Sequence, residues 1–213
     1  MKPRLISLTV LLVFGFALAA QQPGQQGPPT PEQMEAMMKD YMAKYGTPGE
    51  HHEHLKATEG RWTTLTKMWP APGAPPVESK GRAKNKMVLG GRYLATNYKG
   101  EFMGMPFEGT GYAAYDRYKN KYVESWVDTM GTMLVVSEGQ CSNGGKSRTM
   151  TATYDDPMTG KTTVMRSVYT YQDPDHFLLE MYTQQGNAPE FKMMEIQHTR
   201  VKRAKKAAAT PAT

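Results

Sequence analysis

Residues 107–138 read FEGTGYAAYDRYKNKYVESWVDTMGTMLVVSE, and this stretch decides the fold. It holds three runs rich in aromatic and β-branched residues, at positions 107–115, 122–128 and 132–138. Two short turns separate these runs, a polar one at 116–120 and a second that ends on Gly131. Short runs bounded by Gly, Asn and Asp are typical of consecutive antiparallel strands. The stretch therefore predicts a β-meander.

Further strand-like runs lie on both sides of the meander. From residue 61 onward the chain contains about ten runs, at 61–69, 77–88, 92–99, 106–116, 120–129, 132–139, 147–154, 161–171, 175–183 and 190–201. No part of this region has a helical period long enough for the crossover that parallel strands require. We therefore predict an all-β fold, a single antiparallel β-barrel of about ten strands at residues 60–201.

Two patterns that open helices precede the barrel. Thr30 can cap a helix whose first turn contains Pro31 and Gln33. A second capping box is expected at residues 47–50, and the helix that it opens should stop by Gly60. The sequence thus predicts two short N-terminal helices within residues 30–59.

Both ends of the chain are expected to lie outside the fold. Residues 1–20 combine a basic start, an apolar run and small residues, which is the pattern of a secretory signal peptide. Residues 21–29 predict a disordered linker, and residues 202–213 a disordered basic tail. We expect an exported protein, periplasmic or extracellular, with no stable membrane insertion after cleavage. Its formal net charge of +6 is modest, and an exported location argues against a nucleic-acid partner.

The motif Gly60-Arg61-Trp62 follows the second predicted helix and precedes the first predicted strand. It resembles the G-x-W element of lipocalins and their calycin relatives, in which an Arg from the end of the barrel packs across the Trp. The resemblance implies a structural role for Trp62 at the closed end of the barrel. Arg200 is the matching arginine.

A longer pattern runs through the chain, with H-x-x-L-x-x-x-x-G-x-W at 52–62, LGGRYL at 89–94, KYVESWVDTMG at 121–131, DPMTGK at 156–161 and FKMME at 191–195. It resembles the domain-of-unknown-function family 1579 of bacterial proteins over residues 50–201. The resemblance implies a calycin-like β-barrel and no catalytic residues. It also gives His52 a structural role in packing or capping.

Three histidines, His51, His52 and His54, lie at the start of the second predicted helix. His51 and His54 could share a metal ion if His198 or His176 completed the ligand set. However, their spacing is not the H-E-x-x-H of metalloproteases, and histidines at such a position often form a solvated polar face. We interpret them as such a face and predict no metal site.

Cys141 is the only cysteine, so no intrachain disulfide can form. It lies in a turn-like segment, and we interpret it as a bystander rather than a reactive thiol. The chain has no G-x-S-x-G motif and no recognisable catalytic triad. The sequence therefore assigns no catalytic residue.

A cavity is expected inside the barrel, because a barrel of ten strands encloses more space than its own strand side chains need fill. Gly109, Gly111 and Ala113 share one strand face, and we expect these small residues to leave a gap between two aromatic ends. The predicted ligand-binding residues are Phe107, Tyr115, Trp126 and Leu179, with Arg166 or Glu195 as the polar anchor.

These observations favour a non-enzymatic barrel that binds a small apolar or amphipathic ligand. Two alternatives stay open. One is a hydrolase or isomerase that uses cavity carboxylates or His198 as acid–base groups, with Glu124 and Asp128 beside Trp126 as candidates. The other is a barrel that binds haem or a metal through an imidazole. The sequence defines neither a cofactor nor an oligomeric state.

Overall fold

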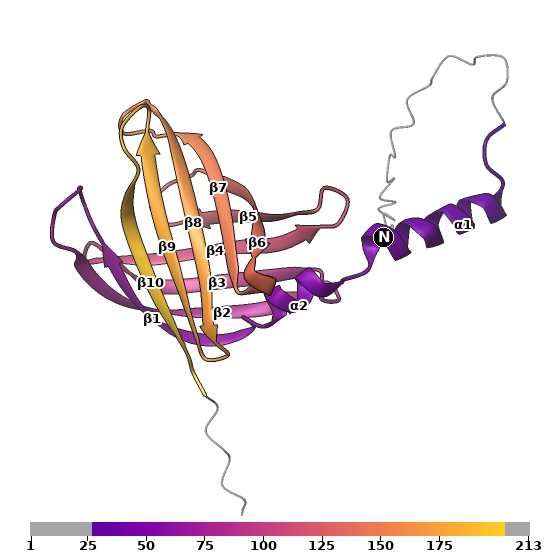
Figure 1. The fold of residues 1–213 in the computed structure, drawn as a ribbon, viewed down its shortest axis with the longest axis horizontal. Coiled ribbons are helices and arrows are strands. Elements are labelled where there is room, and N and C mark those ends of the chain that lie inside the picture. Colours follow the sequence, from indigo (N-terminus) through magenta and orange to yellow (C-terminus); the bar gives the residue numbers. More distant parts are fainter. Residues whose placement is uncertain (1–26, 203–213) are drawn as a thin grey trace, which may run out of the picture. The chain divides into compact units, whose positions relative to one another are not determined.

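The computed structural model describes residues 27–202, and in this part of the chain ten strands form a closed antiparallel barrel (Figure 1). The strands are β1 (Gly60–Met68), β2 (Val77–Val88), β3 (Tyr93–Phe102), β4 (Met105–Asp116), β5 (Lys121–Asp128), β6 (Val135–Ser142), β7 (Ser147–Asp155), β8 (Thr162–Asp173), β9 (His176–Gln185) and β10 (Phe191–Arg200). Each strand pairs with the next, and β10 closes the barrel against β1. The predicted all-β barrel is confirmed.

The meander that decides the fold corresponds to β4, β5 and β6, but its third strand begins later than predicted. β6 starts at Val135 rather than at residue 132. Residues 129–134 instead form the connection from β5, and this connection carries Met130 and Met133. The sequence predicts a turn at Gly131, and the chain does leave the sheet there. Strand pairing resumes only at Val135, which pairs with Trp126 of β5.

Two short helices precede the barrel, as predicted. They are α1 (Pro31–Tyr41), which continues into a π-helical turn (Met42–Gly46), and α2 (Glu50–Lys56). A further helical turn (Asn143–Gly145) joins β6 to β7, so helical structure is not confined to the N-terminal segment. Within residues 27–202, none of the helices has the length and apolar character needed to span a bilayer.

The first predicted helix cap is present, whereas the second differs. Thr30 and Gln33 exchange hydrogen bonds between side chain and backbone, as in a capping box. At α2 the cap is Gly49, whose backbone N–H donates to Nδ1 of His52 at 3.1 Å. Thr47 instead donates its hydroxyl to the carbonyl oxygen of Met42. Histidine thus takes the place expected of a glutamate, which gives His52 a capping role.

The described chain divides into two compact units, the first ending at Asp40 and the second beginning at Tyr41. The first unit contains most of α1. The second contains α2 and the barrel. The predicted signal peptide at 1–20, most of the linker at 21–29 and nearly all of the basic tail lie outside the described residues.

Helix α2 closes one end of the barrel. Its Leu55 is fully buried among Leu94, Ala113, Tyr122 and Met150, which come from four different strands. Figure 1 shows α2 lying beside the ends of the strands. Because this end is filled by an apolar cluster, any open interior must lie toward the opposite end.

Trp62 also lies at the closed end, where its Nε1–H donates to the Thr58 carbonyl at 2.9 Å. The Arg200 guanidinium is stacked over the indole, with its Cζ 4.1 Å from the ring centroid. A Cβ on Gly60 would lie 2.6 Å from Arg200 Nη1, and Gly60 has a positive φ of 138°. Only glycine fits there, because the backbone conformation and the guanidinium both exclude a side chain.

Candidate functional site

The barrel encloses a cavity of about 430 Å³. Its inner end is formed by buried residues next to the closed end, including Thr58, Asn85 and Leu94. Its outer end is bordered by exposed residues, including Met130 and Met133. The cavity therefore opens at the end of the barrel away from α2.

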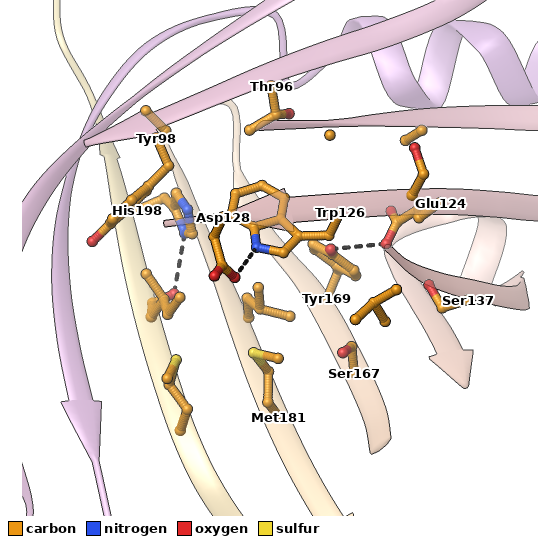
Figure 2. A pocket seen from close by; sticks show the side chains of 18 of the residues that line it. Thr96, Tyr98, Glu124, Trp126, Asp128, Ser137, Ser167, Tyr169, Met181 and His198 are labelled. Carbon is orange, nitrogen blue, oxygen red and sulfur yellow. Dashed lines mark hydrogen bonds between the residues drawn. The ribbon is translucent and has the colours of Figure 1, made fainter. Parts of the chain in front are cut away.

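The middle of the cavity is mainly apolar. Its wall includes Phe107, Trp126, Leu179, Met181 and Ile196. Among these, Trp126 is the largest, and Figure 2 shows its indole lying between the strands that carry the other labelled residues. A concave, largely apolar wall with a few polar groups is the usual form of a small-molecule site.

Trp126 is held in one orientation by its neighbours. Its Nε1–H donates to Oδ2 of Asp128 at 3.0 Å (Figure 2). Asp128 Oδ1 in turn accepts the backbone N–H of Met130 at 2.9 Å. On the neighbouring strand, Gly111 lies directly opposite Trp126. A rigid aromatic surface is thus fixed in the cavity wall.

The two glycines of β4 make room for this indole rather than for a ligand, contrary to the prediction. A Cβ on Gly109 would clash with the Trp126 ring, and a Cβ on Gly111 would lie 2.9 Å from its Cε3 and clash with the Ser125 carbonyl oxygen. The Trp126 ring on β5 therefore occupies the space that side chains at Gly109 and Gly111 of β4 would take. The alternation of residues along a strand could not predict this contact, because it does not give the side-chain orientation of an aromatic residue on the neighbouring strand.

A buried polar network lies deeper in the cavity. Arg148 Nη2 donates to Oε1 of Glu124 at 2.5 Å. The Tyr169 hydroxyl donates to Oε2 of the same carboxylate at 3.0 Å (Figure 2). The Arg148 guanidinium also lies 4.2 Å from the Tyr169 ring centroid. Only 6% of the Arg148 side chain and 15% of the Glu124 side chain are exposed. A charge pair this deep needs its partners, because either ion alone would be strongly destabilising.

Two members of this network, Arg148 and Tyr169, keep their protons at neutral pH. Burial opposes the charge of Arg148, but Glu124 and the surrounding tyrosines outweigh it and raise the pKa of Arg148. Burial, and after it Glu124, raises the pKa of Tyr169 well above its usual range. The network is thus a charged pair with a neutral phenol, and its net charge is close to zero.

Some polar atoms in the cavity wall are unpaired. Three buried side-chain atoms have no hydrogen-bond partner within residues 27–202: Thr66 Oγ1, Asn85 Oδ1 and Arg148 Nε. All three residues line the cavity. An unpaired buried polar atom costs about 1–3 kcal/mol, so these three atoms lower the stability of the wall.

His198 contributes an imidazole to the inner wall, but not an effective base. Its ring is stacked on Phe177 with centroids 3.9 Å apart, and its Nδ1 lies 3.1 Å from the Ile196 carbonyl oxygen. Burial lowers the pKa of His198 to about 4. The ring is therefore neutral at pH 7, and such a low pKa makes it a weak general base.

The structure brings three of the predicted ligand-binding residues to the cavity wall: Phe107, Trp126 and Leu179. Tyr115 lies on the same face of β4 as Phe107, but beyond the cavity, at the closed end of the barrel. There its ring stacks on that of His51 at 3.8 Å and packs against Tyr122 at 5.0 Å. Its role is therefore to support α2 rather than to border the cavity.

Neither predicted polar anchor lies in the cavity. Arg166 forms two hydrogen bonds with Glu190, at 2.9 and 2.6 Å, on the outside of the barrel. Glu195 likewise pairs with Lys192 at 2.7 Å. The reason is strand alternation, since the neighbouring residues Ser167 and Ile196 line the cavity and successive side chains point to opposite faces.

The polar network found in the cavity, instead of the predicted anchor, consists of Glu124, Arg148 and Tyr169. Glu124 was already a candidate through its position beside Trp126, but Arg148 and Tyr169 were not singled out. The sequence does indicate that Arg148 faces inward, because it alternates along β7 with Met150 and Ala152, which are both buried. A charged residue in an apolar phase indicates either a buried ion pair or a wet cavity.

Comparison with known proteins supports the fold and leaves the activity open. Residues 47–200 match the family described as protein of unknown function (DUF1579), in agreement with the resemblance found in the sequence. No curated protein matches the chain.

Two solved structures have a similar fold. The structure of Rv2717c from M. tuberculosis is 15% identical, with a TM-score of 0.54, over 73% of this chain and 100% of that one. The S-type phycobiliprotein lyase CPES from Guillardia theta is 11% identical, with a TM-score of 0.53, over 73% of this chain and 95% of that one. At such low identity, these similarities concern the barrel fold alone.

Proposed function

We propose that this chain, which belongs to the DUF1579 family of proteins of unknown function, binds a small amphipathic molecule inside its barrel. The observation that carries the proposal is the cavity of about 430 Å³, which has an apolar wall and a buried polar network at its inner end. This volume lies within the range of about 300–1,000 Å³ that is typical of small-molecule sites.

The apolar wall would supply most of the affinity. Transfer of apolar surface from water contributes roughly 25 cal/mol per Å², so a ligand that buries about 250 Å² gains about 6 kcal/mol before the cost of association. The fixed indole of Trp126 adds to this gain, because a ring held by Asp128 loses little freedom when a ligand binds.

The inner end would select the polar group of the ligand. Because Glu124 and Arg148 neutralise each other, this region favours a neutral hydrogen-bonding group over a second full charge. Thr66 and Asn85 also line the cavity, and each has a buried side-chain oxygen without a hydrogen-bond partner within residues 27–202. A hydroxyl or amide at one end of an otherwise apolar molecule fits both parts of the cavity.

A binding role is favoured over acid–base catalysis by the state of the candidate groups. Glu124 is occupied by Arg148 and Tyr169, and Asp128 by Trp126 and the Met130 backbone. His198 is neutral, with a pKa lowered to about 4 by burial. These groups hold the wall together and leave little capacity for proton transfer.

Native mass spectrometry of freshly purified protein, together with displacement of an apolar fluorescent probe, tests the proposal. We expect a co-purifying small molecule, or stoichiometric probe binding that long-chain alcohols and amides displace more strongly than matched alkanes or fatty acids. Absence of probe binding to folded protein would contradict the proposal. A Soret band in the purified protein would replace it by the haem-binding alternative.

Export is a separate proposal, based on the pattern of residues 1–20. The mass of the protein recovered from its native host tests it. A mature chain that begins near residue 21 supports export, and a full-length chain recovered from the cytoplasm contradicts it.

A further inference from the structure

A second cluster of chemically reactive side chains lies at the closed end of the barrel. His51, His54 and Cys141 each place one potential ligand atom within 4.8 Å of the other two. Cys141 Sγ lies 3.6 Å from Nδ1 of His51. The Tyr122 hydroxyl lies between the two imidazoles, 3.1 Å from Nδ1 of His51 and 3.3 Å from Nδ1 of His54. Two ring nitrogens, a thiol and a phenol thus converge from α2, β5 and β6.

This arrangement differs from both sequence-based interpretations. The histidines do not form a solvated face: His51 and His54 are partly buried and His52 is buried. Cys141 is part of β6 and contacts His51, so it is not an isolated residue in a turn. Neither of the partners considered for a metal joins them, because His198 lies in the cavity wall and His176 pairs with Asp173.

The surrounding structure holds these side chains in place. His51 and His54 are three residues apart on α2, so they project from the same face of the helix. The His51 ring is stacked on Tyr115 with centroids 3.8 Å apart. On the other side, Gly145 has a φ of +82°, and a Cβ there would lie 2.6 Å from Cε1 and Nε2 of His54. The turn before β7 therefore leaves space that the His54 ring fills.

We propose that His51, His54 and Cys141 bind a divalent metal ion of the Zn²⁺ class, with the Tyr122 hydroxyl beside the fourth coordination position. The ligand set and its spacing carry this inference. Zinc binds imidazole nitrogen at about 2.1 Å and thiolate sulfur at about 2.3 Å, which at a tetrahedral angle separates the two donor atoms by about 3.6 Å. The observed distance between Cys141 Sγ and His51 Nδ1 is 3.6 Å.

The chemistry of the neighbours agrees with this ligand set. The Tyr122 hydroxyl lies within hydrogen-bonding distance of both imidazoles, so it can donate to a neighbouring ligand atom. Glu50 Oε1 lies 4.0 Å from Nε2 of His54, where a carboxylate can orient a coordinating imidazole.

Binding requires one proton to leave. The Cys141 thiol releases its proton to solvent as the sulfur–metal bond forms, while both imidazoles coordinate as neutral ligands. Both Nδ1 lone pairs then point to the metal, and the Tyr122 hydroxyl is free to donate to the thiolate. No oxidant or reductant is involved.

The metal site would be separate from the ligand cavity, because none of His51, His54, Cys141 and Tyr122 lines the cavity. Its effect would be to fasten α2 to β5 and β6, two strands on which the meander depends. Metal binding to the folded state alone raises its stability. The inference therefore does not rest on the proposed ligand.

Titration of metal-free full-length protein tests the site, with Cys141 kept reduced by a phosphine that does not bind metals. We expect one Zn²⁺ per chain in competition with a chromophoric chelator and a higher Tm. With Co²⁺ we expect the intense visible bands of a tetrahedral ion and a near-ultraviolet thiolate charge-transfer band. Absence of the charge-transfer band in folded protein would overturn the proposal.

Three variants complete the test. Cys141→Ser should lose the charge-transfer band and weaken Zn²⁺ binding by more than about 100-fold, since even changes next to metal ligands cost about 10–100-fold. His54→Ala should weaken binding similarly and serves as the second variant if Cys141→Ser fails to fold. The matched control, His176→Ala, removes a histidine paired with Asp173 and should bind as the unmodified chain does. Equal Zn²⁺ affinity in folded His54→Ala or Cys141→Ser would overturn the site.

Discussion

The guanidinium of Arg200, at the end of the last strand, lies 4.1 Å above the indole of Trp62, near the start of the first. The same guanidinium donates to the carbonyl oxygens of Ala57, Glu59 and Pro174 at 2.5–2.8 Å. One side chain therefore connects the end of α2, the β8–β9 turn and the seam where the barrel closes.

Arg200→Ala should lower the free energy of unfolding by about 2–4 kcal/mol. The stacking contributes about 1–2 kcal/mol, and loss of charged donors leaves several carbonyl oxygens unpaired. Denaturant unfolding followed by far-ultraviolet circular dichroism measures the change. Lys202→Ala is the control, because its partner Asp175 is also close to Arg200 but Lys202 is exposed. Equal effects of the two substitutions would show that stacking on Trp62 contributes nothing.

Glu124→Gln should destabilise the barrel by about 3–5 kcal/mol, because it leaves the Arg148 charge buried without its counterion. The matched control is Glu190→Gln, which removes the carboxylate from the partly exposed Arg166 pair and should cost about 0–1 kcal/mol. Thermal and denaturant melts of the two variants compare them directly. Adding Arg148→Met to Glu124→Gln should restore much of the loss, and failure to do so would mean that the buried charge is not its cause.

His198 should make the barrel less stable in mild acid. Burial lowers its pKa to about 4 in the folded state, from about 6.5 in the unfolded chain. Between these values the unfolded state binds a proton that the folded state does not, so stability is full above pH 6.5 and falls as the pH drops toward 4. The total loss from this group is about 3 kcal/mol.

His198→Phe isolates that contribution, because phenylalanine keeps a ring on Phe177 and cannot titrate. Denaturant melts between pH 7 and pH 4 should show a smaller acid-induced loss in the variant than in the unmodified chain. Parallel curves for the two proteins over this range would contradict the low folded-state pKa of His198.

The barrel could be predicted because its signals are local. Runs of aromatic and β-branched residues, turn residues such as Gly90 and Gly91, and the absence of a helical period all act within about ten residues of the chain. Consecutive strands in a meander then pair with their neighbours, so the order of strands follows from the sequence order. Even the closure of β1 on β10 was indicated, through Trp62 and Arg200.

The site could be predicted only in part, because its key contacts join distant segments. Trp126 and Leu179, two of the predicted ligand-binding residues, line the cavity, whereas Arg166 does not. Its neighbour Ser167 lines the cavity instead, because successive strand residues point to opposite faces. Cys141 and His51, 90 residues apart, meet through the packing of α2 against the barrel end. No local pattern encodes that contact, so the cluster of His51, His54 and Cys141 emerges only from the structure.

The last prediction concerns the space inside the barrel. Because Gly109 and Gly111 hold the Trp126 ring, a side chain added there would disturb the sheet instead of filling the cavity. Ser167 is the better position: it is buried and lines the cavity from β8. Ser167→Leu should occupy part of the empty volume and weaken binding of an apolar fluorescent probe at least about ten-fold, which corresponds to about 1.4 kcal/mol.

The control for this variant is Thr170→Leu, which adds a leucine to the same strand at an exposed position and should leave probe affinity unchanged. Stability separates a true cavity from a packed interior. Leucine in empty space should maintain or raise the Tm, whereas forcing it into a filled core would cost about 1–3 kcal/mol. If Ser167→Leu is destabilised by that amount, or binds the probe as tightly as Thr170→Leu does, the barrel does not hold its ligand in this cavity.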